Sequence, residues 1–331
     1  MNRRDFLYRS GAALSLSLLA RGPLFAQAAS TSSGQAPSTG SGQLPAPVGH
    51  PPVRPPTPVT EFKALRRNTG IFTGRGGTIG WLVNPDAVVV VDTQFPDTAA
   101  LCLAGLPGRA GRTLDAVIDT HHHLDHTSGN KVFQPATRMI VGHRNVPALQ
   151  AAAFARNPQI GEQTPPDTLF TDTWRKEVGD ETVSARHFGP AHTGGDIVVH
   201  FERANVVHVG DLVFHRIHPV MDRPGGSQVR NWIKVLETVA GTYPPDALYV
   251  FGHGRQSFGV TGALADVLAQ RDFLTVLVGH VEKQIAAGRS RAEIITLTNL
   301  PGFPDYDSDP KSSRLPGNLG AVYDELTGAK A

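Results

Sequence analysis

From residue 61 onward, short apolar runs alternate with longer segments that are apolar on one face only. The short runs are bounded by turn-forming residues, which is typical of β-strands. They predict strands at 71–72, 79–83, 87–91, 116–119, 139–141, 182–188, 196–201, 205–209 and 248–251. The longer segments have helical periodicity and predict helices at 97–106, 146–156, 229–240, 262–287 and 318–326. The Pro-containing segment 157–172 is predicted to be a loop.

Strands and helices alternate in two successive halves of the chain, without an exact internal repeat. The run 87–91 is apolar at every position, which indicates a strand covered on both faces. Near the end of the chain, Ser290 and Glu293 form a capping-box pattern that predicts a short helix. We therefore expect an α+β fold in which two sheets pack face to face with helices outside.

The composition is that of an ordinary globular protein, with 40% hydrophobic and 18% charged residues. The formal net charge is +2, and no basic run interleaves with aromatic residues, so a nucleic-acid partner is not expected. Cys102 is the single cysteine, so no intrachain disulfide can form. Its leucine neighbours predict a buried apolar position in a helix.

Residues 1–28 have the features of an export signal. Asn2–Leu7 resembles a twin-arginine signal, a weakly apolar stretch follows from Gly11 to Ala20, and Ala26–Ala28 offers a small-x-small cleavage site. The apolar stretch is too short to span a bilayer stably, so no stable membrane anchor is expected after cleavage. The interpretation is export to the periplasm by the twin-arginine machinery. A Sec signal and an uncleaved anchor are the alternatives.

The remaining chain divides into three predicted regions. Residues 29–60 are rich in Ser, Thr, Gly and Gln and then in Pro, which indicates a disordered linker. Residues 61–299 carry the alternating strands and helices. Residues 300–331 are a C-terminal extension with a short helix.

The sequence His121-His122-His123-Leu124-Asp125-His126 follows the predicted strand 116–119. On an extended segment, side chains two positions apart point the same way, so His121 and His123 can share one ion while His122 faces away. As the chain turns, Asp125 and His126 can reach a second ion. Imidazole nitrogen with carboxylate oxygen suits zinc best, with iron or manganese possible.

Three further segments place a metal-capable side chain beside glycine at the end of a predicted strand. They carry His192 in Gly-Pro-Ala-His-Thr, Asp211 in Gly-Asp, and His253 in Gly-His-Gly. Glycine lets the backbone turn sharply while a neighbouring side chain is aimed at a common point.

These four motifs, in this order, resemble the metallo-β-lactamase-fold hydrolase superfamily over about residues 61–299. The resemblance implies a four-layer αββα sandwich with the site at one edge between the sheets. It implies that His121, His123 and His192 hold a first metal and that Asp125, His126 and His253 hold a second. It also implies that Asp211 bridges the two ions, which would be two Zn²⁺.

Two dications met by two carboxylates and five neutral imidazoles retain about two positive charges, which favour a bridging hydroxide. A zinc site can lower the pKa of bound water from about 15.7 toward about 7. Asp125 is the candidate catalytic residue, because it can orient the nucleophile or take its proton. The expected function is hydrolysis of a small-molecule ester, lactone, thioester or lactam.

Two alternative functions stay open. In the β-lactamases that the sequence resembles, Ser or Cys stands at the position of Asp211, which disfavours a β-lactamase proper. A mononuclear iron sulfur-dioxygenase of the same superfamily needs fewer metal ligands than this chain offers. The substrate itself cannot be read from the motifs.

Three residues and two loops have predicted supporting roles. Asp92 ends the buried strand 87–91 and is a candidate to orient a ligand histidine. His215 and His218 follow Asp211 closely and are candidate substrate-pocket residues. The loops 157–172 and 212–228 are expected to set specificity.

Overall fold

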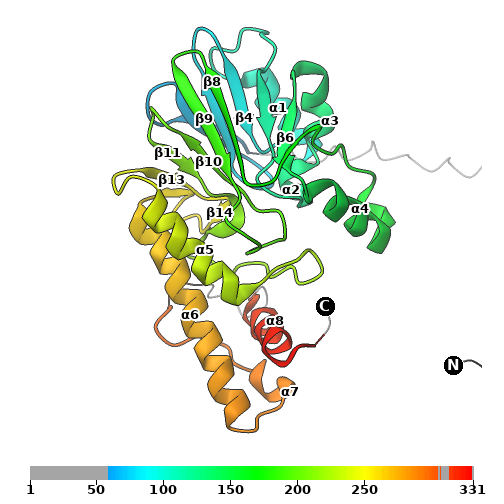
Figure 1. Ribbon diagram of the computed structural model, residues 1–331, viewed down its shortest axis with the longest axis vertical. Helices are drawn as coiled ribbons and strands as arrows, with labels where there is room; N and C mark the ends of the chain where they lie inside the picture. Colours follow the sequence, from blue (N-terminus) through cyan, green and yellow to red (C-terminus); the bar gives the residue numbers. More distant parts are fainter. Residues whose placement is uncertain (1–58, 305, 307–312, 330–331) are drawn as a thin grey trace, which may run out of the picture. The chain divides into compact units, whose positions relative to one another are not determined.

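Two mixed β-sheets form the centre of the fold (Figure 1). The computed structural model describes residues 59–304, 306 and 313–329. The predicted signal 1–28 and the predicted linker 29–60 as far as residue 58 lie outside the described residues. Within the described part of the chain, no helix combines the length and the apolar character needed to cross a membrane.

The first sheet runs in sequence order. Its described strands are β1 (Glu61–Ala64), β2 (Thr69–Thr73), β3 (Ile79–Val83), β4 (Val88–Val91), β5 (Ala116–Ile118), β6 (Ile140–His143) and β7 (Thr168–Phe170). Strands β1 to β4 are antiparallel, whereas β4 to β7 are parallel. Because β4 and β5 are parallel, the residues that follow them emerge at the same edge of the sheet.

The second sheet has a similar mixture of strand directions. Its order is β15 (Thr261–Gly262), β13 (Leu248–Val250), β11 (Val206–His208), β10 (Val198–Phe201), β9 (Glu181–Arg186) and β8 (Thr173–Val178). Strands β11 and β13 are parallel, so their carboxyl ends also share one edge. Beside this edge, β12 (Phe214–His215) pairs with β14 (His253–Gly254).

Helices cover the outer face of each sheet (Figure 1). The described helices are α1 (Pro96–Gly105), α2 (Leu124–Thr127), α3 (Asn130–Phe133), α4 (Val146–Arg156), α5 (Val229–Thr242), α6 (Leu264–Ala286), α7 (Arg291–Ile294) and α8 (Leu315–Thr327). Helices α1 and α3 pack on the first sheet, and α5, α6 and α8 pack on the second. Apolar side chains of both sheets, such as Ile118 and Phe201, meet between them. The predicted α+β fold with four layers is confirmed.

Most predicted elements are present, but several short elements were not predicted, among them α2, α3, β12 and two exposed edge strands. The prediction of a Pro-containing loop at 157–172 is wrong in part, because the segment contains β7 and the 3₁₀-helix η2 (Pro158–Ile160). Strands β1 and β8 were not predicted. Strands β1 and β8 expose charged residues and β7 exposes Leu169, and none of the three has a long continuous apolar run.

Helices α1 and α7 have the features that the sequence predicts. Cys102 is fully buried in α1, where burial raises the pKa of its thiol. Helix α7 has the predicted capping box between Ser290 and Glu293. In the predicted C-terminal extension, α8 packs Leu315 and Leu319 into the same core as Trp232 of α5. This helix is therefore an integral part of the helical layer on the second sheet.

Candidate metal centre

Seven histidine and aspartate side chains meet at the edge where β5, β11 and β13 end. His121, His123, Asp125 and His126 lie on the segment that leaves β5 and enters α2. Asp211 lies in the 3₁₀-helix η3 (Gly210–Leu212) directly after β11. The second sheet supplies the remaining donors, His192 from the loop between β9 and β10, and His253 from the segment after β13.

A first group of donors consists of His121, His123, His192 and Asp211, whose candidate ligand atoms all lie within 4.8 Å of one another. His192 Nε2 lies 3.0 Å from His123 Nδ1 and 3.5 Å from Asp211 Oδ2. His121 Nε2 lies 3.9 Å from the same Asp211 oxygen. Three imidazoles and a carboxylate are thus arranged around one point.

A second group consists of Asp125, His126 and His253, whose candidate ligand atoms also lie within 4.8 Å of one another. His253 Nε2 lies 3.0 Å from Asp125 Oδ2 and 3.3 Å from His126 Nε2. Asp211 also touches this group, with its Oδ1 3.1 Å from His126 Nε2 and its Oδ2 3.5 Å from His253 Nε2.

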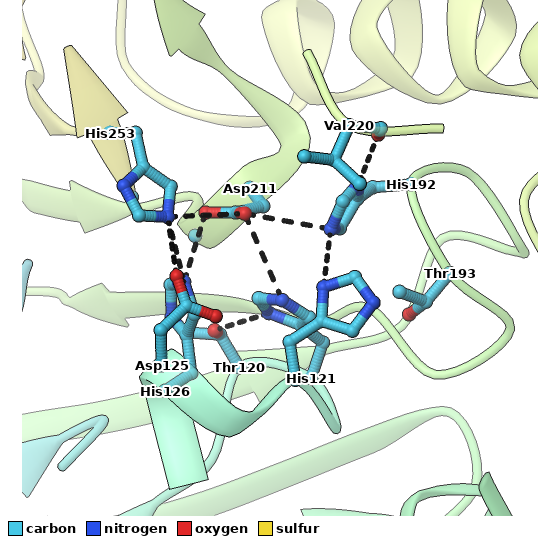
Figure 2. A network of polar contacts seen from close by, with 12 residues as sticks. Thr120, His121, Asp125, His126, His192, Thr193, Asp211, Val220 and His253 are labelled. Carbon is cyan, nitrogen blue, oxygen red and sulfur yellow. Dashed lines mark hydrogen bonds and ion pairs between the residues drawn. The ribbon is translucent and has the colours of Figure 1, made fainter. Parts of the chain in front are cut away.

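Asp211 stands between the two groups (Figure 2). Its carboxylate is almost fully buried and contacts imidazoles of both groups. Gly252 packs against it so closely that a Cβ at this position would overlap Asp211 Oδ1. Similarly, a Cβ at Gly77 would overlap the His126 ring. These two glycines are required for the close approach of the backbone to the donors.

Hydrogen bonds fix which nitrogen of each imidazole faces the centre. His192 Nδ1 lies 2.9 Å from the Val220 carbonyl, and His126 Nδ1 lies 2.7 Å from Asp92 Oδ2. Carbonyl and carboxylate oxygens only accept, so each Nδ1 donates and Nε2 is the nitrogen that faces the other donors. At His126 this Nε2 also faces the Asp211 carboxylate, so a proton or a metal ion can lie between them. His123 is reversed, because its Nε2 lies 2.9 Å from Asp222 Oδ2 and its Nδ1 faces the centre.

The arrangement fits a bound cation. Lone pairs of His123 and His192 face each other at 3.0 Å, which is repulsive unless a positive charge lies between them. His121 Nε2 is buried and has no hydrogen-bond partner among the described residues. An imidazole and carboxylate donor set of this kind suits a divalent metal ion.

The electrostatic environment also favours positive charge. Burial opposes protonation of His126, but the surrounding carboxylates of Asp211, Asp92 and Asp125 raise its pKa well above the ordinary value. At Asp211, burial is outweighed by His253 and His126, which lower the pKa of the carboxyl well below its usual range. Conversely, burial and the neighbouring His123 lower the pKa of His192 to about 3, so this imidazole is neutral and able to ligate.

Asp92 contacts a donor as the sequence predicts. It follows β4 in the left-handed backbone region, with φ of 63°, and is fully buried. Besides His126, it accepts hydrogen bonds from the Thr120 amide and from Thr120 Oγ1. Thr120 Oγ1 in turn lies 3.1 Å from His121 Nδ1. Asp92 therefore orients one donor directly and a second through Thr120.

Asp222 is a contact that the sequence analysis did not identify. His122 belongs to neither of the two donor groups, but it is buried and its Nε2 lies 3.5 Å from Asp222 Oδ2. The same Asp222 oxygen accepts the hydrogen bond from His123 Nε2. The glycines at 225 and 226 mark a turn in this loop, but no sequence pattern links Asp222 to the histidines.

A cleft of about 700 Å³ opens beside the centre. His123, Asp125 and His253 lie in its lining, together with His122 and Asp222. The rest of its wall is mainly apolar and includes Phe95, Leu124, Ala153, Ile160 and Val220. Both loops expected to set specificity contribute to this wall, through Ile160 and Gln163 on one side and Val220 and Asp222 on the other.

The two predicted pocket histidines do not line this cleft. His215 is buried, with Nδ1 2.9 Å from the Gly259 carbonyl and Nε2 3.2 Å from Asp266 Oδ1. His218 packs against Phe273 of α6. Their prediction as substrate-pocket residues finds no support, because β12 and the following turn direct both side chains toward α6.

Comparisons with known proteins agree with the fold. The family model described as the metallo-beta-lactamase superfamily matches residues 72–253, more than half of the chain. A probable metallo-hydrolase of Methanocaldococcus jannaschii is 27% identical over 179 residues, which cover 50% of this chain and 82% of that protein. A hydroxyacylglutathione hydrolase of Brucella anthropi is 29% identical over 146 residues. That match covers 43% of this chain and only 50% of the relative.

Solved structures share the fold at low sequence identity. A sec-alkylsulfatase from Pseudomonas sp. has a TM-score of 0.57 and 15% identity, over 78% of this chain and 49% of the other. A metallo-beta-lactamase from Pontibacter korlensis has a TM-score of 0.55 and 17% identity, over 66% of this chain and 99% of the other. The four donor segments, the fold and the family match lead to one conclusion: the chain belongs to the metallo-beta-lactamase superfamily and is a metal-dependent hydrolase.

Proposed function

We propose that this hydrolase binds two divalent metal ions, in preference zinc, and cleaves an ester, thioester, lactone or lactam bond. The observation that carries the proposal is Asp211, whose carboxylate lies between two complete donor groups. A site for one metal ion would need only one group of ligands, so it would not account for Asp125, His126 and His253 as a second group. The donor chemistry favours zinc, with iron or manganese possible.

The protein supplies orientation and proton transfer in this proposal. Bound zinc lowers the pKa of water and polarises the bond to be cleaved. Asp125 lines the cleft, and its side chain is 31% exposed, so it can contact both substrate and nucleophile. Burial opposes ionisation, but His126 and the hydrogen bond with His253 lower the pKa of Asp125. Asp125 therefore enters the reaction as a carboxylate, able to orient the nucleophile or accept its proton.

The test combines metal analysis with a hydrolysis panel. We expect about two zinc ions per chain, and hydrolysis of at least one member of a panel of β-lactams, lactones, thioesters including hydroxyacylglutathione, and phosphate and sulfate esters. A single bound iron ion per chain would contradict the proposal and favour sulfur-dioxygenase chemistry. Hydrolysis confined to β-lactams would identify a β-lactamase proper.

Asp211→Ala tests the shared ligand. The variant should bind less metal and lose most hydrolysis, whereas Asp272→Ala on the exposed side of α6 should behave as the parent protein. Full metal content and full activity in Asp211→Ala would refute the bridging role.

We also propose that the enzyme acts in the periplasm. The support is the sequence of residues 1–28, with Arg3 and Arg4 followed by Phe6-Leu7. Residues 1–40 fused to a folded reporter should direct its export, and Arg3→Lys/Arg4→Lys should abolish it. Export that survives the double substitution would point to the Sec route instead.

A further inference from the structure

Among the described residues, the mainly apolar wall of the cleft beside the metal centre carries one charged side chain that has no ion-pair partner. Apolar surface comes from five separate places in the chain, through Phe95, Leu124, Ala153, Ile160 and Val220. Such a surface is suited to an aliphatic or aromatic group, and the cleft volume of about 700 Å³ is typical of small-molecule sites.

The acidic side chains of the lining already have partners. Asp125 belongs to the second donor group, where it contacts His253. Asp222 contacts His122 and His123. Neither carboxylate is therefore available to attract a cationic substrate.

Arg156 is the remaining charged residue of the lining. It is the last residue of α4 and is exposed. No described carboxylate forms an ion pair with it, whereas other described arginines, such as Arg67, Arg75 and Arg291, are paired.

We propose that the cleft binds an anionic amphiphile, with an apolar stretch against the wall of Phe95, Ala153 and Ile160 and an anionic group at Arg156. The anion can be a carboxylate, sulfonate, sulfate or phosphate, because a guanidinium pairs with each of them. As a statement about the substrate of hydrolysis, this inference rests on the proposed function. As a statement about what the cleft binds, it can be tested without turnover.

The first experiment measures binding of octanesulfonate to the zinc-loaded protein by titration calorimetry. Arg156→Gln should weaken binding about fivefold, since an exposed ion pair contributes up to about that factor. Arg230→Gln, which removes an exposed arginine outside the cleft, should bind as the parent protein. Affinity for 1-octanol should be unchanged in both variants.

A chain-length series tests the apolar wall. From butanesulfonate to hexanesulfonate to octanesulfonate, affinity should rise about three- to fourfold for each methylene that is fully buried. Ala153→Phe should reduce the rise in affinity with chain length, because the larger side chain would occupy the apolar part of the cleft. Ala155→Phe, on the same helix but outside the lining, is the matched control and should preserve the gain.

The outcomes separate this inference from the hydrolase proposal. Octanesulfonate affinity that does not depend on Arg156, or that does not rise with chain length, would overturn the inference even if the protein hydrolyses members of the panel. Loss of affinity in Arg156→Gln and in Ala153→Phe supports the inference even if every panel ester is resistant.

Discussion

Asp92 and Asp222 each accept a hydrogen bond from one imidazole and thereby direct its other nitrogen to the metal centre. They act on opposite nitrogens: His126 donates from Nδ1 and His123 donates from Nε2. Asp92 is fully buried, whereas the side chain of Asp222 is 18% exposed at the cleft. Both carboxylates act through a histidine and are therefore positioning residues.

Asp222→Asn should weaken zinc binding about 10- to 100-fold, the usual effect of losing a partner that orients a ligand histidine. A neutral amide favours the required His123 tautomer less strongly than a carboxylate. Competition with a chromophoric chelator measures the affinity. Asp222→Glu should restore part of it, because a carboxylate is again within reach. An Asn variant with the parent's zinc affinity would show that Asp222 does not position His123.

The sequence identified Asp92 but not Asp222, for a physical reason. Asp92 directly follows a buried strand parallel to β5, so its distance from the donors follows from sheet geometry. Asp222 lies 99 residues from His123, on a loop whose path depends on packing. His215 and His218 illustrate the same limit, because nearness to Asp211 in the chain did not place them in the cleft.

His143 gives a pH dependence of stability away from the metal centre. It is buried at the end of β6 and stacks on His187, with ring centroids 4.0 Å apart. Burial, followed by the charge of His187, lowers the pKa of His143 from 6.5 to about 4. The unfolded chain thus binds a proton between these values that the folded protein does not, so stability is lost as pH falls from about 6.5 toward 4.

We expect His143→Phe to remove about 1–2 kcal/mol of the stability difference between pH 7.5 and pH 5. Urea unfolding at the two pH values measures this difference for each protein. His280→Gln, on α6, is the control and should retain the parent's pH dependence. An unchanged difference in His143→Phe would exclude His143 as its source.

At the scale of elements, α8 completes the N-terminus of α5. Gln228 provides no side-chain cap for α5, whose first amides would otherwise lack partners. Glu325 of α8 accepts hydrogen bonds from the amides of Val229 at 2.7 Å and Arg230 at 3.1 Å. A carboxylate at this end of a helix also interacts favourably with the helix dipole.

Glu325→Ala should therefore lower the free energy of unfolding by about 1–2 kcal/mol, the usual cost of losing a helix cap. Glu282→Ala, at an exposed position of α6, should change it little. Urea denaturation compares the two variants. Equal stability of Glu325→Ala and the parent protein would show that α5 does not depend on this cap.

The elements that sequence patterns predicted best are those that bury at least one face in the core. The run 87–91 is buried throughout as β4, and the 262–287 pattern corresponds to α6. Strand β8 alternates between exposed and partly buried residues and carries Arg175, Lys176 and Glu177, so it offered no apolar run. The cap at α5 could not be predicted, because it joins residues 96 positions apart.

At the scale of the whole molecule, the donor set connects the two sheets. His121, His123, Asp125 and His126 extend from the first sheet, and His192, Asp211 and His253 extend from the second. The order of the motifs predicted that these residues meet, and the separations of their side chains agree. The cleft was not predictable in the same way, because its walls come from loops and from α4.

Metal removal should consequently destabilise the protein as a whole. A ligand that binds only the folded state at 100 times its Kd contributes about 2.7 kcal/mol, which raises Tm by about 4–5 °C in a protein of this size. We expect chelation to lower Tm by at least this amount and added zinc to restore it, as measured by calorimetry. Asp211→Asn should show a smaller response to zinc, because the shared ligand is weakened, whereas Asp272→Asn should respond as the parent does. If chelation leaves Tm unchanged while metal analysis shows that the ions have gone, the sheets are held together by their apolar interface alone and the metal centre does not stabilise the fold.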